Sequence, residues 1–390
     1  MSMHDGRWIT TLGTIALACT GVRADVLPAW INEPTTAVWQ RVVDDAEGHK
    51  LQVVLRWPDD DGDGYERWAF RDGAEYFYPA STIKLCAAVA ALEKLNGRIE
   101  TTGAELSAAT PLAWPGEEAS TTLGADVRRI FVVSDNPAFN RLYDFCGRTF
   151  LNERMAAWGL EDSRITHRLS VARTPEENRR TPEVRMVNDE GDLLAASPAA
   201  RCDLTLSSEG MAGLRVGTAR MSGGERLDEP IDFTFHNAAS LDDLQRALVA
   251  MTDERDRSMR LTRAQRALLV EAATMLPRDS TDPAYDPETY TDDYVKFLLP
   301  GLLRTAPMED WRVTNKVGLA YGFVTENARV EHVPSGRVVF VAATLYVNPN
   351  GVMNDNTYGY DETSLPFMAD LGEAVGRALL RDADESAAGE

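Results

Sequence analysis

Two side chains near the start of an expected helix have the chemistry for acyl transfer. Ser81 and Lys84 are three positions apart, so they lie on one face of a helix, a turn from each other. A serine hydroxyl needs a base to take its proton, and a partly buried neutral lysine amine can act as that base. The helix start also directs backbone N–H groups toward a reacting carbonyl. The alternative for Ser81 is a simple helix N-cap.

Two further short patterns could complete such a site. Ser-Asp-Asn at 134–136 supplies a second hydroxyl that can relay a proton, and Asn136 offers a donor and an acceptor to a substrate amide. In Lys-Val-Gly at 316–318, the lysine could hold an anionic group, and the glycine lets a substrate backbone approach closely. Taken singly, each pattern also has a purely structural explanation, such as a helix cap.

The order of the three patterns is more informative than any one of them. A Ser-x-x-Lys helix start, a Ser-Asp-Asn helix start and a Lys-x-Gly strand follow one another along the chain. In this respect the sequence, from about residue 40 to residue 381, resembles the class A β-lactamases and penicillin-binding proteins. The resemblance implies acylation of a serine by a lactam or peptide carbonyl, followed by hydrolysis of the acyl-enzyme.

Carried over position by position, the resemblance makes Ser81 the nucleophile and Lys84 its proton acceptor or relay. Ser134 would pass the proton to the leaving nitrogen, and Asn136 would bind the acylamino side chain. The backbone N–H groups of Ser81 and Leu319 would form the oxyanion hole, in which two donors face the developing charge.

The third pattern departs from the family at its central residue. Lys316 is expected to support the substrate carboxylate and Ser134, and Gly318 to leave room for the substrate. Val317 stands where the family usually has threonine or serine, and it lacks the hydroxyl that would bond a carboxylate. Loss of one charge-assisted hydrogen bond costs about 1.5–3 kcal/mol, which is about one to two decades in affinity.

A second departure concerns the base for deacylation. Class A β-lactamases hold the hydrolytic water with a glutamate on a loop after Ser-Asp-Asn, and an asparagine follows four residues later. Here the matching segment runs from Pro175 to Asn178, which puts Thr174 at the glutamate position. Glu176 or Glu177 could still reach the site by a different loop path. The alternative is a solvated polar loop.

Hydrophobic periodicity and turn residues indicate an α/β (α+β) fold with an antiparallel sheet, flanking helices and a mostly helical subdomain. Short connections between the late strands require antiparallel pairing. We expect the cleft between the sheet and the helical subdomain, and loops over the polar segment 165–235. The expected strands cover 51–57, 66–71, 311–317, 320–333 and 337–347; the expected helices cover 81–95 with Gly97 just past the end, 124–146 with a new start at Ser134 or Asp135, 240–252, 262–276 and 364–381.

The chain is expected to consist of a leader and one hydrolase domain. Residues 1–24 are typical of a signal peptide, because an apolar run is followed by Val-Arg-Ala at a cleavage position. We therefore expect an exported domain over 25–390, periplasmic or secreted, with lipid anchoring at Cys19 as the less favoured route. Within it, the helical subdomain covers about 98–300, between the strands at 51–71 and those at 311–347.

Composition narrows the range of partners. A formal net charge of −21 repels nucleic-acid phosphates and anionic lipid, and no later apolar run reaches the length of a bilayer span. The few histidines and the cysteine spacing do not form a zinc pattern, so we expect no metal and no organic cofactor. Cys86, Cys146 and Cys202 allow at most one disulfide. We expect a monomer with a small-molecule or peptide substrate.

Three alternatives to β-lactam hydrolysis stay open at this point. A D,D-carboxypeptidase acting on cell-wall peptides would share every pattern. An esterase or amidase on the same scaffold is favoured by Val317, which suits a substrate without a carboxylate. The third alternative is a binding protein that has kept the fold without the activity.

Overall fold

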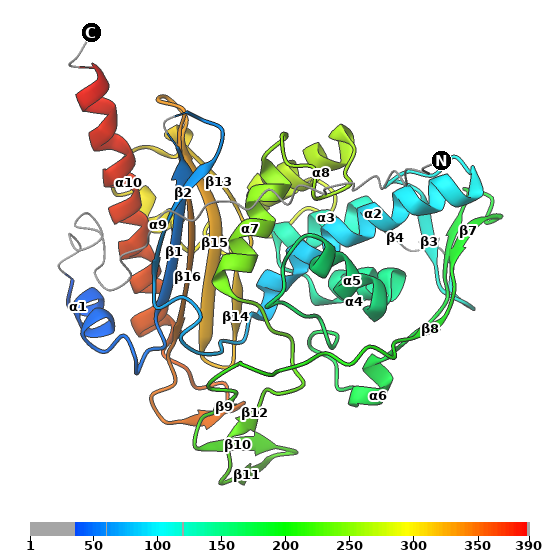
Figure 1. Ribbon diagram of the computed structural model, residues 1–390, viewed down its shortest axis with the longest axis horizontal. Helices are drawn as coiled ribbons and strands as arrows, with labels where there is room; N and C mark the ends of the chain where they lie inside the picture. Colours follow the sequence, from blue (N-terminus) through cyan, green and yellow to red (C-terminus); the bar gives the residue numbers. More distant parts are fainter. Residues whose placement is uncertain (1–35, 60, 119–120, 388–390) are drawn as a thin grey trace, which may run out of the picture.

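The protein is built around one sheet with helices on both sides (Figure 1). The computed structural model describes residues 36–59, 61–118 and 121–387, so the expected signal peptide lies outside the described residues. The sheet strands are β1 (Gln52–Pro58), β2 (Tyr65–Phe70), β13 (Trp311–Asn315), β14 (Gly318–Ala320), β15 (Phe323–His332) and β16 (Arg337–Tyr346). Their order is β13-β15-β16-β1-β2, with β14 also pairing β15, and all pairs are antiparallel. The expected antiparallel sheet, shared by the early and late strands, is confirmed.

Helices cover both faces of the sheet, so its central strands are buried on both sides. β1 and β16 accordingly consist mostly of apolar residues without strict alternation, and β15 is buried at eight of its ten positions although several of its residues are polar. One face is covered by α1 (Ala37–Asp44), α9 (Leu299–Leu302) and α10 (Leu365–Ala387) (Figure 1). The rings of Trp39 in α1 and Phe367 in α10 stack with centroids 4.6 Å apart, which joins the two ends of the described chain.

On the opposite face, α7 (Leu241–Thr252) lies between the sheet and the helical region. The helices at 240–252 and 262–276 are confirmed, and the Ser240 and Thr262 hydroxyls accept the expected N-cap hydrogen bonds. The other helices on this side are α2 (Lys84–Thr102), α3 (Leu123–Val132), α4 (Asn136–Cys146), α5 (Arg148–Ala157), α6 (Pro175–Asn178) and α8 (Arg263–Thr274).

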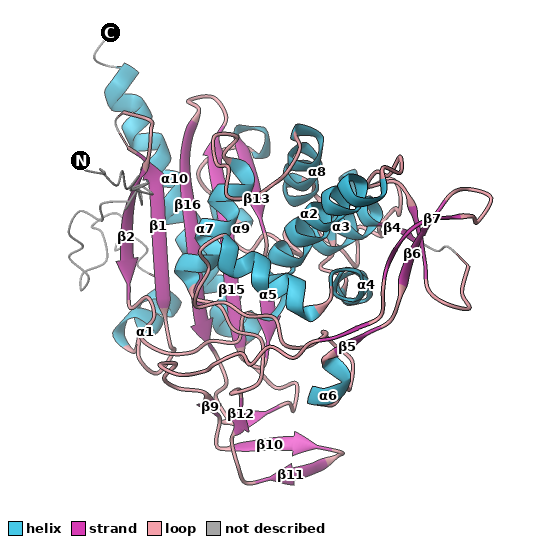
Figure 2. Cartoon of the chain, turned by 45° about the vertical axis from the view of Figure 1, so that its right-hand side comes forward, coloured by secondary structure: helices cyan, strands magenta, loops and turns pink. Residues whose placement is uncertain are grey.

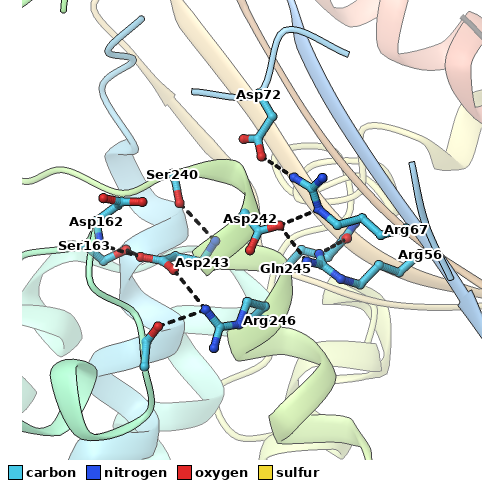
Figure 3. Close-up of polar contacts among 11 residues, drawn as sticks. Arg56, Arg67, Asp72, Asp162, Ser163, Ser240, Asp242, Asp243, Gln245 and Arg246 are labelled. Carbon is cyan, nitrogen blue, oxygen red and sulfur yellow. Dashed lines mark hydrogen bonds and ion pairs between the residues drawn. The ribbon is translucent and has the colours of Figure 1, made fainter. Parts of the chain in front are cut away.

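Polar contacts hold α7 to its neighbours on both sides (Figure 3). The Asp242 carboxylate accepts from Arg56 on β1 and from Arg67 on β2, each at 2.6 Å. The next residue, Asp243, accepts from the Ser163 hydroxyl at 2.9 Å on the side of the helical region. Helix α7 therefore links the sheet to the segment that follows α5.

The first helix is longer than the sequence suggests. Its expected end near Gly97 is wrong, because α2 continues to Thr102 and ends at Gly103, whose φ of 65° is the left-handed C-cap conformation. Glycine at 97 is tolerated inside the helix, since nothing lies near the position of an added Cβ. The helix is buried over most of its first three turns among α3, α4, α5 and α7.

The expectation of loops throughout 165–235 is also wrong. The segment contains short strands, and those between β9 and β12 gather beyond one end of the central sheet (Figure 2). Strands of two to five residues are too short for a periodic signal. They and their partners are β3 (Pro111–Ala113), β4 (Thr121–Thr122), β5 (Arg180–Thr181), β6 (Val184–Val187), β7 (Leu193–Ser197), β8 (Ala200–Arg201), β9 (Arg215–Val216), β10 (Ala219–Ser222), β11 (Glu225–Leu227), β12 (Ile231–Asp232) and β17 (Val352–Met353).

Two further properties of the described residues bear on the sequence expectations. Cys86, Cys146 and Cys202 are buried free thiols. Within the described part of the chain, no helix combines the length and apolar character that a membrane crossing requires.

Candidate active site

The segment that carries Ser81 is a tight turn at the entrance to α2. Ala80–Ile83 form a 3₁₀ turn, and α2 begins directly at Lys84. Ala80 has a φ of 46°, a left-handed conformation that is strained for a residue with a Cβ. The strained residue therefore immediately precedes a half-buried serine at the start of a long buried helix.

Ser134 and Asn136 lie beside this helix start. Ser134 has a φ of 57°, and the side chain of the following Asp135 caps α4 by accepting from the backbone N–H of Ala138. The expected helix start at this position is confirmed, with Asp135 rather than Ser134 as the cap. The Lys84 Nζ donates to Asn136 Oδ1 at 2.7 Å and to Ser134 Oγ at 3.3 Å.

Lys316 approaches the same hydroxyl from the sheet. Its Nζ lies 2.9 Å from Ser134 Oγ and 3.0 Å from the carbonyl oxygen of Val317. The expected strand at 311–317 is shorter than predicted: β13 ends at Asn315 and β14 starts at Gly318, so Lys316 occupies the break between them. The structure thus brings Lys84, Ser134 and Lys316 together, although they come from three distant segments.

Burial lowers the pKa of both lysine amines, Lys84 and Lys316, and so favours their neutral forms. Burial and the nearby charge of Lys316 hold the pKa of Lys84 well below its usual value. Burial lowers the pKa of Lys316 to about 7, against the opposing influence of Glu326. The lowered pKa favours the neutral form of Lys84, which can act as a base, and Lys316 is close to its midpoint of titration at neutral pH.

The Ser81 hydroxyl forms no hydrogen bond with any described residue, and Lys84 instead contacts Ser134 and Asn136. Hydrogen bonds between a catalytic base and its nucleophile are often loose in the absence of substrate. The arrangement therefore places a base one helical turn from an unengaged nucleophile.

β14 forms the wall on the other side of Ser81. A Cβ on Gly318 would lie 2.4 Å from the carbonyl oxygen of Pro79 and 3.2 Å from the backbone nitrogen of Ser81. Leu319, the next residue, is 40% exposed and lines the same cleft as Ser81. Only a glycine at 318 permits this close approach of the strand to the nucleophile.

We expect Gly318→Ala to lower the rate constant for acylation about 10²-fold, because the methyl group must push β14 away from the Ser81 backbone. The measurement is the second-order rate of labelling by a fluorophosphonate, followed by intact mass. Gly97→Ala is the matched control, since nothing surrounds a Cβ there. Equal labelling rates for Gly318→Ala and Gly97→Ala would contradict the role of close approach.

The cleft that contains Ser81 has a volume of about 470 Å³. We call it the catalytic cleft. One wall of the cleft is formed by the segment from 291 to 300. The only acidic residue among its described lining is Asp293, and no arginine lines it. The lining residues are Ser81, Val133, Ser134, Thr291, Asp293, Tyr294, Val295, Phe297, Pro300, Val317, Leu319 and Leu365.

A buried polar network holds this wall against the sheet. Lys296 Nζ is fully enclosed and donates to Asn315 Oδ1 at 2.8 Å, while Asn315 Nδ2 donates to Glu326 Oε1 at 2.7 Å. Burial raises the pKa of Glu326 to about 7 and lowers that of Lys296 to about 8. Sequence reasoning missed Lys296 and Glu326. The available signal for Lys296 was a charged residue inside an apolar run, whereas Glu326 stands between polar residues and gave no such signal.

The glutamates considered for deacylation are occupied elsewhere. Glu176 is exposed and pairs with Arg180 and Arg201, each at 3.0 Å. Glu177 accepts from the backbone N–H and the hydroxyl of Thr174 and forms a capping box at the start of α6. Thr174 itself is the N-cap of that helix. Neither carboxylate lines the catalytic cleft in the described structure.

Part of the chain resembles a known protein family. Residues 36–200 match the model described as the Beta-lactamase enzyme family. The chain is similar to solved structures described as β-lactamases from Sphaerobacter thermophilus, Desulfarculus baarsii and Burkholderia ambifaria, at 16%, 16% and 15% identity and a TM-score of 0.48 in each case. The alignments cover 87%, 88% and 87% of this chain and 94%, 96% and 98% of those structures. No curated protein matches the chain.

Proposed function

We propose that this chain, whose residues 36–200 match the model of the Beta-lactamase enzyme family, is a serine hydrolase that is acylated on Ser81. The observation that carries the proposal is the convergence of two buried lysines, Lys84 and Lys316, on the hydroxyl of Ser134 beside the Ser81 turn. Buried amines are costly for stability, and proton transfer from a serine to a leaving group is the chemistry that uses them.

In acylation, Ser81 Oγ forms an ester bond to the acyl carbon while the bond between that carbon and the leaving group breaks. The neutral Lys84 accepts the Ser81 proton, and Ser134 passes a proton to the leaving group. The backbone N–H groups of Ser81 and Leu319 stabilise the oxyanion, and Asn136 binds the acyl side of the substrate. Water then attacks the ester, which releases the acid and restores the Ser81 hydroxyl.

The family suggests an amide or β-lactam substrate, and one feature favours a second candidate, an ester or amide with an uncharged leaving group. β-Lactams and D-alanyl peptides carry a carboxylate on the leaving-group side of the bond that breaks. On that side this chain has Val317, which has no hydroxyl, and Asp293, which repels an anion. Esterase or amidase activity is therefore the second candidate function.

Three reagents test the proposal: a chromogenic cephalosporin, a fluorescent penicillin and a simple 4-nitrophenyl ester. Turnover of the cephalosporin would identify a β-lactamase, and stable penicillin labelling without turnover a penicillin-binding protein. Ester hydrolysis without labelling would identify the second candidate. Absence of all three, together with no phosphonate adduct, would refute a serine hydrolase and leave a binding protein.

The two lysines predict a bell-shaped pH dependence of acylation. The rate should rise with pH as Lys84 becomes neutral, and fall above about pH 7 as Lys316, whose pKa burial lowers to about 7, loses its charge. Because the Lys316 charge lowers the pKa of Lys84, Lys316→Met should raise that pKa and move the rising limb to higher pH. The falling limb should disappear, with a loss on the order of 10²-fold at pH 7.

The measurement is the second-order acylation rate constant from pH 5 to pH 9. Lys50→Met is the matched control, because it also removes one lysine charge. Lys50 pairs with Glu75 and does not line the catalytic cleft or the cavity that contains Arg148. A Lys316→Met profile with the same two limbs as the wild type would show that Lys316 does not control the titration.

A further inference from the structure

A second cavity adjoins the catalytic cleft on the side of Asn136. Its volume is about 540 Å³. We call it the arginine pocket, because its described lining contains five arginines and no acidic residue in a chain with a net charge of −21. The arginines are Arg148, Arg164, Arg168, Arg173 and Arg179.

Among these arginines, Arg148 gives the strongest evidence that the pocket binds a ligand. It is 8% exposed, and no described residue accepts a hydrogen bond from its guanidinium group. The Nε atom is buried without a partner. A buried Nε without an acceptor is rare and costly, so the place of Arg148 on the cavity lining indicates a ligand that supplies the missing acceptor. The imidazoles of His167 and His236, which also line the cavity, each have one buried ring nitrogen without a partner.

Other arginines of the pocket are fixed by the surrounding structure. Arg164 donates to the carbonyl oxygens of Thr234 and His236, at 2.9 and 3.1 Å. Arg168 pairs with Asp144, which compensates one charge. The remaining charges have no carboxylate among the lining residues, so the cavity retains a positive potential.

The pocket is connected to the catalytic residues through hydrogen bonds. The Ser170 hydroxyl lines the pocket and accepts from Asn136 Nδ2 at 2.7 Å, and Asn136 in turn accepts from Lys84. Tyr321, another lining residue, directly follows β14, and Tyr78 lies three residues before Ser81. The pocket therefore lies next to Asn136, the residue proposed to bind the acyl side of the substrate.

Charge is thus arranged in opposite ways on the two sides of Ser81. The leaving-group side has Asp293 and no arginine among its described lining, whereas the acyl side has five arginines. Val171 and Phe235 lie on the lining of the arginine pocket with exposed side chains, 46% and 75% accessible, and they suit a short aliphatic chain. The complementary molecule is an ester or amide with an anionic acyl arm and an uncharged leaving group.

We propose that the arginine pocket binds a carboxylate at the far end of the substrate's acyl group, so that the preferred substrates are half-esters or half-amides of dicarboxylic acids. This inference rests on the proposed acylation of Ser81. Ser81 forms its ester with one carboxyl carbon of the diacid, the leaving group departs with a proton, and the free carboxylate pairs with Arg148. Water then releases the diacid.

The test compares two matched esters: the mono-4-nitrophenyl ester of glutaric acid, and the same compound with its free carboxylate methylated. We expect the wild-type kcat/KM to favour the free acid by about 10- to 10²-fold, the value of a charge-assisted hydrogen bond. Arg148→Met should abolish this preference by lowering kcat/KM for the free acid more than for the methylated compound. Arg226→Met is the control, since it removes the same charge from an exposed residue paired with Asp228.

Two additional variants keep the test decisive. Arg173→Met changes an exposed lining residue and should reduce the same preference if Arg148→Met does not fold. Ser81→Ala should be stabilised against thermal unfolding by glutarate, and Ser81→Ala with Arg173→Met less so. Equal wild-type kcat/KM values for the two esters would overturn the inference, and so would an equal loss of kcat/KM for both esters in the arginine variants. Neither result would contradict the proposed hydrolase activity. If no ester reacts, the thermal stabilisation of the protein by glutarate tests the pocket alone. Stabilisation would support carboxylate binding in the arginine pocket without the hydrolase activity, and no stabilisation would overturn the inference.

Discussion

Ser81→Ala will form no covalent adduct with acylating or phosphonylating reagents, and its esterase rate will fall by at least about 10³-fold. The nucleophile occupies a strained turn, and no other hydroxyl is placed both at the start of α2 and one turn from Lys84. Ser134 is the hydroxyl of the cleft closest to Lys84, but it is engaged by both lysines and serves as the relay, while Thr291 and Tyr294 lie on the opposite wall segment from 291 to 300. The fold should be unaffected, because the change removes one half-buried oxygen atom.

Intact mass after incubation with a fluorophosphonate measures the adduct, and thermal unfolding checks the fold. Ser107→Ala, at an exposed position outside both cavities, is the matched control and should be labelled like the wild type. An adduct on Ser81→Ala as abundant as that on Ser107→Ala would remove Ser81 from the mechanism.

The acyl-enzyme will persist, because neither glutamate considered as a base for deacylation lines the catalytic cleft of the described structure. Glu176 and Glu177 are bound to arginines and to Thr174 on the surface, and Thr174 is too weak a proton acceptor at neutral pH. Water attack then depends on Lys84, because Asp293, the one carboxylate in the described cleft lining, is exposed and accepts a hydrogen bond from Thr291. Loss of an assisting base typically lowers a rate by about 10²–10⁴-fold. A burst of about one equivalent of product, followed by a slow steady state, is the expected result.

Rapid mixing with a 4-nitrophenyl ester or a penicillin measures the burst, and quenched intact mass follows the ester on Ser81. Glu176→Gln and Glu177→Gln should each leave the slow phase unchanged within about threefold, because neither carboxylate lines the cleft. Linear turnover above about 10 s⁻¹ without a burst would show that a competent base exists. A selective loss in one of the two variants would identify it.

The parts of this protein that sequence reasoning found are those encoded locally. Caps and periodicity located α7, α8 and the start of α4, and short turns fixed the antiparallel order of the late strands. Spacing alone put Ser81 and Lys84 on one helix face. The end of α2 was misplaced because a glycine in a helix interior and a glycine at a C-cap are identical in sequence, and only φ separates Gly97 from Gly103.

The missed features depend on contacts between distant segments. Arg148 and Arg173 face one cavity although α5 and the loop before α6 are separate in the chain, and neither has a spacing that marks a site. Lys296 and Glu326 become informative only when both are found enclosed around Asn315. An exposed charge and a buried one look alike in sequence, so the polarity of the two cavities could not be predicted.

The position of α7 has a consequence for how variants of this protein would be interpreted in a genetic screen. Residues 241–252 line neither cavity, yet Asp242 and Asp243 join the layer that carries Lys316 to the layer that carries Ser81. Alleles that break these contacts would separate groups that must meet within a fraction of an ångström. Inactive alleles would therefore cluster in a helix that never touches substrate, and a map drawn from activity alone would mistake this helix for part of the site.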